Sequence, residues 1–331
     1  MLEHEQHILY VFPGQGSQYA GMGSDLHEEF AVARNIYAEA GEVLGYDIAE
    51  LSFADPEDKL NLTRYTQPAL LTHSVACLEI FRELTDDRLK PAITAGHSLG
   101  EYTALVAAKV LSFEGALRLV QKRGELMGTH GEGEMTAFPL ALDVIKPIAE
   151  KFNCAVAGCN LPEQTVVGGR SEDLEKVEQE VKENFRRKRP VRLKTEGAFH
   201  TFYMNKAAEL FRPVLEEATF ESAEARVLSN YTGGYHEDDP AKIRDGLYYQ
   251  LRNPVLWHAN LLTAFGDGVK MIFEFGGGIG PAETPDGKRP NLEGMIKKAS
   301  LAAEHEAEYR SAINLQSVRE TSDFVNNPEA G

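Results

Sequence analysis

The sequence predicts an α/β fold, in which a large domain with a parallel sheet is interrupted by a small α+β subdomain. Over residues 8–129, short apolar segments typical of buried strands alternate with helical patterns, an order typical of parallel sheets. From about residue 134 the pattern changes to closely spaced short strands around one polar helix. A chain of 331 residues is long enough to bury a core in both units.

The first strand is predicted at 6–12, and it runs into the glycine-rich loop 13–18. This loop has neither the Lys-Ser/Thr of a phosphate loop nor the spacing of a dinucleotide fingerprint. We therefore expect it to present a backbone amide at the carboxyl end of the strand, and not to bind phosphate. Helical patterns follow at 24–45 and 66–86.

A Gly-x-Ser-x-Gly pentad at 96–100 is the motif with the most direct chemical meaning. A strand pattern at 91–95 precedes it and a helical pattern at 101–111 follows. This is the arrangement of a nucleophile elbow, a sharp turn that lifts a serine hydroxyl out of the sheet. The following helix would aim its first amides at an anion formed beside Ser98. Ser98 is therefore the candidate nucleophile.

The small subdomain is predicted at 134–200, and the large domain at 1–133 and 201–331. Within the small subdomain we expect one polar helix at 171–185 and strands at 135–142, 155–157, 164–167 and 190–195. The large domain is expected to resume with strands at 225–229 and 269–275 and to end in a frayed polar tail after about residue 316.

Two further residues could assist a serine. His200 lies where the subdomain returns the chain to the large domain, and such crossings line clefts, although most histidines are structural or exposed. Arg123 lies within the apolar face of a helix predicted at 113–129. A guanidinium in that position needs an anion, either a structural carboxylate or a substrate carboxylate held bidentately. His97 is adjacent to Ser98, but successive residues of such a turn point apart, so it is a poor candidate base.

Composition excludes several functional classes. A net charge of −17 argues against a nucleic-acid partner. No apolar run approaches the roughly 18 residues of a membrane span, and residues 1–5 are not a signal peptide, so we expect a cytoplasmic protein with no membrane partner. The three cysteines lack metal-binding or redox spacing, so we expect no metal. The basic segment 186–194 is either a solvated helix end with an edge strand or a docking patch for an acidic partner.

Six ordered motifs within residues 8–315 resemble one family. They are Phe12–Gln18 with Gly21–Gly23, Thr66–Leu70, Gly96–Glu101, Lys122–Met127, Ala198–His200 and Gln250–Trp257. Together they resemble the malonyl-coenzyme A:acyl carrier protein transacylases and the acyltransferases of polyketide synthases, here in a free-standing form. The resemblance implies an α/β-hydrolase-like core with a parallel sheet and a small ferredoxin-like subdomain.

The resemblance also implies catalytic roles. Ser98 would be the nucleophile and His200 the general base. The backbone amides of Gln15 and Leu99 would form the oxyanion hole. The main-chain carbonyl of Gln250 would orient the histidine, which fixes the imidazole tautomer without adding a buried negative charge.

Substrate contacts follow from the same resemblance. Arg123 would bind the malonyl carboxylate, and Gln67, Phe199 and Asn160 would contact the substrate. The substrate would be an acyl-CoA or acyl-phosphopantetheine, with no bound cofactor and no metal. The acceptor would be an acidic acyl carrier protein, acting with a monomeric enzyme whose docking patch would comprise Arg186, Arg187, Lys188 and Arg189.

The implied reaction is ping-pong transfer of an acyl group, with malonyl as the first expectation, through acyl-Ser98 to a carrier thiol in polyketide or fatty-acid biosynthesis. Departures from the family pattern, such as the polar insertion 279–291 and the bulky residues after His200, leave two alternatives open. One is transfer of a larger acyl, aminoacyl or peptidyl group between two carrier proteins. The other is editing hydrolysis of acyl-carrier proteins. A scaffold role without catalysis is disfavoured because the serine, the histidine and the oxyanion loop are all present.

Overall fold

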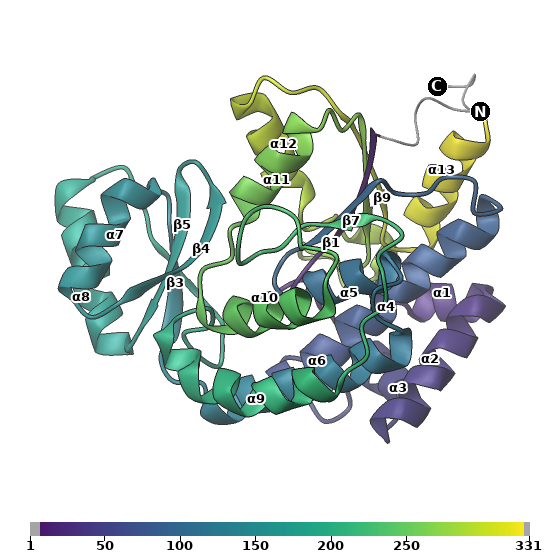
Figure 1. Ribbon diagram of the computed structural model, residues 1–331, viewed down its shortest axis with the longest axis horizontal. Coiled ribbons are helices and arrows are strands. Elements are labelled where there is room, and N and C mark those ends of the chain that lie inside the picture. Colours follow the sequence, from purple (N-terminus) through teal and green to yellow (C-terminus); the bar gives the residue numbers. More distant parts are fainter. Residues whose placement is uncertain (1–6, 328–331) are drawn as a thin grey trace.

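The computed structural model describes residues 7–327, which contain two β-sheets (Figure 1). The larger sheet has five strands in the order β7-β2-β1-β8-β9, and every neighbouring pair is parallel. Its strands are β1 (Ile8–Phe12), β2 (Ile93–Gly96), β7 (Arg226–Val227), β8 (Met271–Phe275) and β9 (Glu308–Ala312). The predicted parallel sheet is therefore confirmed.

The central strand β1 is buried along its whole length because helices cover both faces of this sheet. Alternate side chains of β1 enter different cores, as strand geometry requires. Tyr10 packs in the larger core, which includes α4 and α6, whereas Leu9 and Val11 pack with Trp257 of α11 in the second core.

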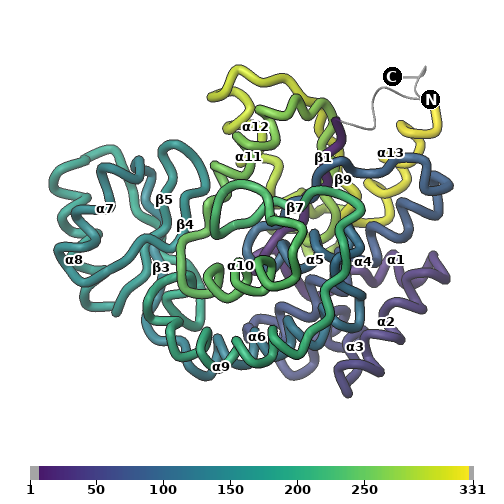
Figure 2. The backbone as a smooth tube through the Cα atoms, in the orientation of Figure 1, coloured from purple at the N-terminus to yellow at the C-terminus, as the bar shows by residue number. Residues whose placement is uncertain are grey.

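Eleven helices belong to this large unit within residues 7–327, and Figure 2 traces their path. They are α1 (Ser24–Glu29), α2 (Ala31–Leu44), α3 (Ile48–Phe53), α4 (Thr63–Leu84), α5 (Gly100–Ala107), α6 (Phe113–His130), α9 (Asn205–Glu217), α10 (Pro240–Arg252), α11 (Trp257–Gly266), α12 (Glu293–Ala302) and α13 (Leu315–Asn326). None of the helices in the described part of the chain is both long and apolar enough to cross a membrane.

The second sheet has the order β4-β5-β3-β6 and is antiparallel throughout. Its elements are β3 (Glu134–Phe138), α7 (Leu142–Lys151), β4 (Ala155–Leu161), β5 (Gln164–Gly169), α8 (Ser171–Asn184) and β6 (Val191–Leu193). This βαββαβ order is the ferredoxin-like arrangement, and its sheet and helices share a small separate core. The predicted ferredoxin-like subdomain is confirmed as a fold, and these elements occupy residues 134–193, inside the predicted range 134–200.

Several predicted boundaries are wrong. The helical pattern at 24–45 forms two helices, because the backbone of Phe30 is extended. The strand predicted at 135–142 ends at Phe138, and α7 begins at Leu142. Pro139 follows the strand directly and has no N–H to donate to a partner strand. Residue 6 of the predicted first strand lies outside the described residues.

The predicted frayed tail is also wrong, since α13 occupies most of it. Asn314 caps this helix: its side chain accepts a hydrogen bond from Ser317 N, and the Ser317 hydroxyl accepts one from Asn314 N. Val318 is buried in the larger core. A capping box and one buried apolar contact therefore hold a segment whose polar composition indicated a loose end.

We predict that Asn314→Ala lowers the free energy of unfolding by about 1 kcal/mol, since it removes the cap of α13. Urea denaturation followed by circular dichroism measures the change. Gln316→Ala, on the exposed face of the same helix, serves as the control and should change stability by less than about 0.5 kcal/mol. Equal losses in the two variants would contradict a specific capping role.

Candidate active site

Ser98 lies in a tight turn between the end of β2 and the start of α5. Its φ is 54°, in the left-handed region that a serine rarely adopts. The turn leaves no room for side chains beside the serine. A Cβ at Gly96 would lie 1.8 Å from the carbonyl carbon of Gly100, and a Cβ at Gly100 would lie 2.1 Å from the Phe12 oxygen. The pentad thus forms a strand-turn-helix elbow with the hydroxyl facing outward.

His200 lies directly against Ser98. The distance from Ser98 Oγ to His200 Nε2 is 2.7 Å, and His200 Nδ1 is 2.7 Å from the main-chain oxygen of Gln250. A carbonyl oxygen only accepts hydrogen bonds, so Nδ1 carries the proton and donates it. His200 Nε2 is then left free to accept the serine hydroxyl proton.

Burial favours the neutral form of this histidine. It lowers the pKa of His200 to about 3, and the nearby positive charge of Arg123 adds to the effect. The imidazole is 5% exposed. A neutral imidazole with a free Nε2 is the form that can act as a base.

The two residues expected to form the oxyanion hole lie in the same cleft as Ser98. Gln15 and Leu99 both line the cleft around Ser98, and neither amide N–H has a hydrogen-bond partner within residues 7–327. The amide of Ser98, by contrast, donates to Asn230 Oδ1 at 2.6 Å. The side chain of Gln15 donates to Thr63 Oγ1 at 3.1 Å, which anchors the glycine-rich loop. Two unpaired amides at a serine hydroxyl can receive an oxyanion.

Arg123 extends from α6 into the site and is 1% exposed. Its Nη2 donates to Ser98 Oγ at 3.2 Å and to Gln250 Oε1 at 3.0 Å, and the guanidinium lies 5.4 Å from the ring centre of Tyr102. Within the described chain, no carboxylate lies within 4.0 Å of the Arg123 nitrogens. Burial accordingly lowers the pKa of Arg123. The sequence left two partners open for Arg123, a structural carboxylate and a substrate carboxylate. Within the described residues no structural carboxylate is in direct contact with Arg123.

These residues surround a cleft of about 940 Å³ between the large unit and the small subdomain. The small subdomain contributes Asn160, Gln164, Val166 and Leu193, and the segment before and within α12 contributes Asn291, Leu292 and Met295. The expected substrate contacts Gln67, Phe199 and Asn160 all line the cleft. Asn160 Oδ1 also lies 2.9 Å from His97 Nε2, so His97 is engaged away from the serine.

The basic segment lies outside this cleft for most of its length. Arg189 lines a neighbouring groove of about 450 Å³ together with Lys298 of α12. Gln164 lines both spaces, so the groove adjoins the cleft. Lys188 forms an ion pair with Glu163 at 2.7 Å. The groove consequently has two cations from different parts of the fold.

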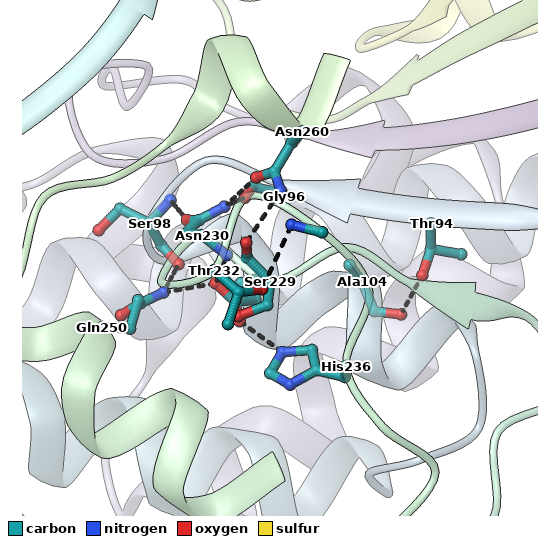
Figure 3. Close-up of polar contacts among 12 residues, drawn as sticks. Thr94, Gly96, Ser98, Ala104, Ser229, Asn230, Thr232, His236, Gln250 and Asn260 are labelled. Carbon is teal, nitrogen blue, oxygen red and sulfur yellow. Dashed lines mark hydrogen bonds and ion pairs between the residues drawn. The ribbon is translucent and has the colours of Figure 1, made fainter. Parts of the chain in front are cut away.

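Sequence reasoning missed the polar residues behind the serine. Asn230 Nδ2 donates to the main-chain oxygen of Gly96 at 2.8 Å and to Asn260 Oδ1 at 2.9 Å. Asn230 Oδ1 accepts a hydrogen bond from the main-chain N–H of Ser98 (Figure 3). It stands 132 residues from Ser98, and no motif spacing links them. Glu101, the last residue of the elbow motif, accepts hydrogen bonds from Asn230 and Gln250 behind the serine. Its position on the otherwise apolar helix α5 was the available signal.

The insertion at 279–291 ends at the wall of the cleft. The carboxylate of Glu274 in β8 accepts three hydrogen bonds. They come from the main-chain N–H groups of Asn291 at 2.7 Å and Leu292 at 3.0 Å, and from the hydroxyl of Tyr309 at 2.6 Å. Burial raises the pKa of Glu274 to about 7, although these three donors favour its ionised form. A buried carboxyl group therefore fixes the point at which the insertion joins α12.

Comparisons with known proteins agree with this geometry. The acyl transferase domain family matches residues 9–275. A malonyl CoA-acyl carrier protein transacylase of Bacillus subtilis is 37% identical over 303 residues, covering 88% of this chain and 90% of that protein. The polyketide biosynthesis malonyl CoA-acyl carrier protein transacylase PksC of the same species is also 37% identical, covering 90% of this chain and 98% of that protein.

Solved structures of the same kind share the whole fold. A malonyl-CoA:acyl carrier protein transacylase from Xanthomonas oryzae superposes with a TM-score of 0.85 and 32% identity, covering 98% of this chain and 99% of that one. A malonyl-transacylase solved in complex with its type II polyketide synthase acyl-carrier protein gives a TM-score of 0.84 at 33% identity, covering 96% and 99%.

We predict that Ser98 reacts with a sulfonyl fluoride at a rate that is constant between pH 8 and pH 5. The lowered pKa of His200 keeps its Nε2 unprotonated throughout this range. Rates are to be measured by mass spectrometry of the labelled protein. A rate that falls with a midpoint near 6.5, the ordinary histidine pKa, would contradict this assignment.

The folding stability of the protein must be checked at each pH at which the labelling rate is measured. The unfolded chain binds a proton at His200 below pH 6.5 and the native protein does not, so stability falls as the pH decreases below 6.5. Circular dichroism at each pH shows whether the protein is still folded.

Proposed function

The chain belongs to the acyl transferase domain family, and we propose on this basis that it transfers a malonyl group from CoA to the phosphopantetheine thiol of an acyl carrier protein, in fatty-acid or polyketide biosynthesis. The observation that carries the substrate assignment is the buried guanidinium of Arg123, which touches the nucleophile and has no carboxylate partner within the described residues. The names of the relatives support malonyl. Nothing in the cleft favours the two alternatives, transfer between carriers or editing hydrolysis.

In the first half-reaction, His200 Nε2 removes the Ser98 proton as Oγ attacks the thioester carbonyl of malonyl-CoA. The carbonyl oxygen becomes an oxyanion that accepts hydrogen bonds from the amides of Gln15 and Leu99. Each such donor contributes about 3–4 kcal/mol to transition-state stabilisation. When the tetrahedral intermediate collapses, the carbon–sulfur bond breaks, His200 returns its proton to the leaving thiolate, and a malonyl ester of Ser98 remains.

In the second half-reaction, the carrier thiol occupies the position that the CoA thiol has left. His200 removes the thiol proton, and the sulfur attacks the ester carbonyl through the same oxyanion hole. The carbon–oxygen bond then breaks and the proton passes from His200 to Ser98 Oγ. The enzyme returns to its starting state without a cofactor or a metal.

Arg123 would hold the malonyl carboxylate through two parallel hydrogen bonds. The carboxylate would supply the anion that the buried guanidinium lacks in the free enzyme. The Gln250 carbonyl supports this role indirectly, because it orients His200 without placing a second negative charge beside the substrate. The free cysteines are in keeping with a reducing compartment, and we propose a cytoplasmic enzyme.

We also propose that the carrier protein docks on the basic side chains Arg186, Arg187, Lys188 and Arg189. Carrier proteins of this class are acidic, whereas the enzyme has a net charge of −17, so docking needs a local positive surface. Arg187 and Arg189 are exposed, and Arg189 borders the groove that adjoins the cleft. This position suits a partner that must deliver its thiol to Ser98.

Mixing the protein with malonyl-CoA is predicted to give a covalent malonyl adduct, seen as a mass increase of the intact protein. Ser98→Ala should abolish the adduct, because alanine lacks the Oγ atom that forms the ester bond. Ser222→Ala, a change at an exposed loop serine, is the control and should retain it. If wild-type protein remains unmodified by malonyl-CoA but is acylated by an acyl-carrier protein, the malonyl-CoA assignment is wrong.

Reversing Arg187 and Arg189 to glutamate is predicted to raise KM for the carrier protein about tenfold, because two rim charges then repel an acidic partner. The rate of malonyl loading from CoA should not change. The same charge change placed elsewhere, at Lys109 and Lys242, provides the control. If KM for the carrier protein is unaltered in the variant with both arginines changed to glutamate, Arg187 and Arg189 are not part of the docking surface.

A further inference from the structure

A buried histidine–glutamate pair lies behind the active site and has no part in the chemistry described above. His236 Nε2 is 2.6 Å from Glu101 Oε1, and both side chains are almost completely buried, at 5% and 0% exposure. Figure 3 shows His236 near Asn230 and Gln250, and its pairing with Glu101 joins the loop after Asn230 to helix α5, which begins two residues after Ser98. A carboxylate only accepts hydrogen bonds, so His236 donates to Glu101.

The other oxygen of Glu101 holds two groups that contact the nucleophile. Glu101 Oε2 accepts the Asn230 amide at 3.0 Å and Gln250 Nε2 at 3.0 Å. Asn230 Oδ1 in turn accepts a hydrogen bond from the main-chain N–H of Ser98. Gln250 Nε2 also donates to the main-chain oxygen of Ser98 at 2.8 Å. The Glu101 side chain is therefore linked to the main chain of Ser98 through two residues, Asn230 and Gln250.

The carboxylate also fixes which way the Gln250 side-chain amide faces. Gln250 Nε2 donates to two acceptors, Glu101 Oε2 and the main-chain oxygen of Ser98. Gln250 Oε1 therefore faces the guanidinium and accepts a hydrogen bond from Arg123 Nη2 at 3.0 Å. The reversed amide would place an oxygen against two acceptors and an NH₂ group against a cation. One orientation satisfies all three contacts, and Glu101 Oε2 supplies one of the two acceptors that select it.

Helix α10 is shaped to receive His236. A Cβ at Gly246 would lie 2.9 Å from His236 Cε1, so only glycine leaves space for the imidazole. Glycine within a helix lowers stability by about 1 kcal/mol relative to alanine. Gly246 precedes Gln250 by four residues, which places both on the same face of α10. His236 thus packs against α10 one turn before Gln250 and connects this helix to α5.

We propose that His236 and Glu101 are positioning residues that set substrate selectivity: through the side chain of Gln250 they hold Arg123 where it receives the substrate carboxylate. The proposal rests on the proposed malonyl transfer. It assigns to the Gln250 side chain a role separate from that of its main-chain carbonyl, which orients His200. Loss of the pair should therefore impair malonyl loading more than loading of an acyl group that lacks a carboxylate.

The test compares the rates at which malonyl-CoA and acetyl-CoA acylate Ser98, measured by rapid quench and intact mass spectrometry. His236→Ala is expected to lower the malonyl rate about tenfold, the size of one lost hydrogen bond to a charged group, and to leave the acetyl rate unchanged. His236→Gln keeps an N–H donor and should restore most of the malonyl rate. Glu101→Gln keeps the shape of the side chain without its charge and should lower the ratio as well.

His73→Ala is the matched control, because His73 is an equally buried histidine that bonds to the Ile313 oxygen away from the cleft. It should lower the melting temperature without changing the malonyl-to-acetyl ratio. If His236→Ala and Glu101→Gln lower both rates by the same factor, or change neither, the pair is only structural and the inference is overturned. If wild-type protein loads no malonyl group, the proposed function fails, and this inference fails with it.

Discussion

The active site depends on one steric constraint, the close approach of three backbone segments that only glycine permits. Gly96 lets the end of β2 approach the start of α5, Gly100 lets α5 approach the end of β1, and a Cβ at Gly14 would lie 2.3 Å from the His97 oxygen. The glycine-rich loop after β1 is thereby held against the elbow after β2. Because parallel strands end at one edge of a sheet, Gln15 and Leu99 both come to line the cleft at Ser98.

Electrostatics then determine what this edge of the sheet can bind. The site buries one permanent cation, Arg123, while burial lowers the pKa of His200 and so disfavours a second. A carbonyl oxygen orients the histidine where a carboxylate would introduce a negative charge. The buried carboxylate of Glu101 is separated from Arg123 by the side chain of Gln250, so an anionic acyl group would be the direct partner of the guanidinium. A protein with a strongly negative surface potential still selects a negatively charged substrate, because selection occurs in a buried environment.

Local hydrophobic patterns predicted the parallel sheet and a small inserted subdomain, and the family resemblance, which rests on short motifs, predicted the ferredoxin-like order of that subdomain. The sequence also singled out Ser98, His200, Arg123 and Gln250, which the fold brings within hydrogen-bond distance of one another. What it could not show are contacts between distant segments. Asn230 and His236 reach the elbow from more than a hundred residues away, and neither belongs to a pattern that indicates a partner. The tail helix was missed because its cap and its single buried valine are weak signals in a polar segment.

The division of the cleft between two units has a consequence for how such enzymes can diversify. Ser98 and Arg123 stand on the large unit, whereas Val166 and Leu193 in the lining of the cleft belong to the small antiparallel sheet, where they pack against the larger core. Substitutions at these two positions would therefore change the lining of the cleft and the packing between the two units together. Recombination that exchanges residues 134–193 between relatives would retain the nucleophile but would also exchange one side of this shared packing, so the segment together with its packing partners is the unit for engineering new building-block choice.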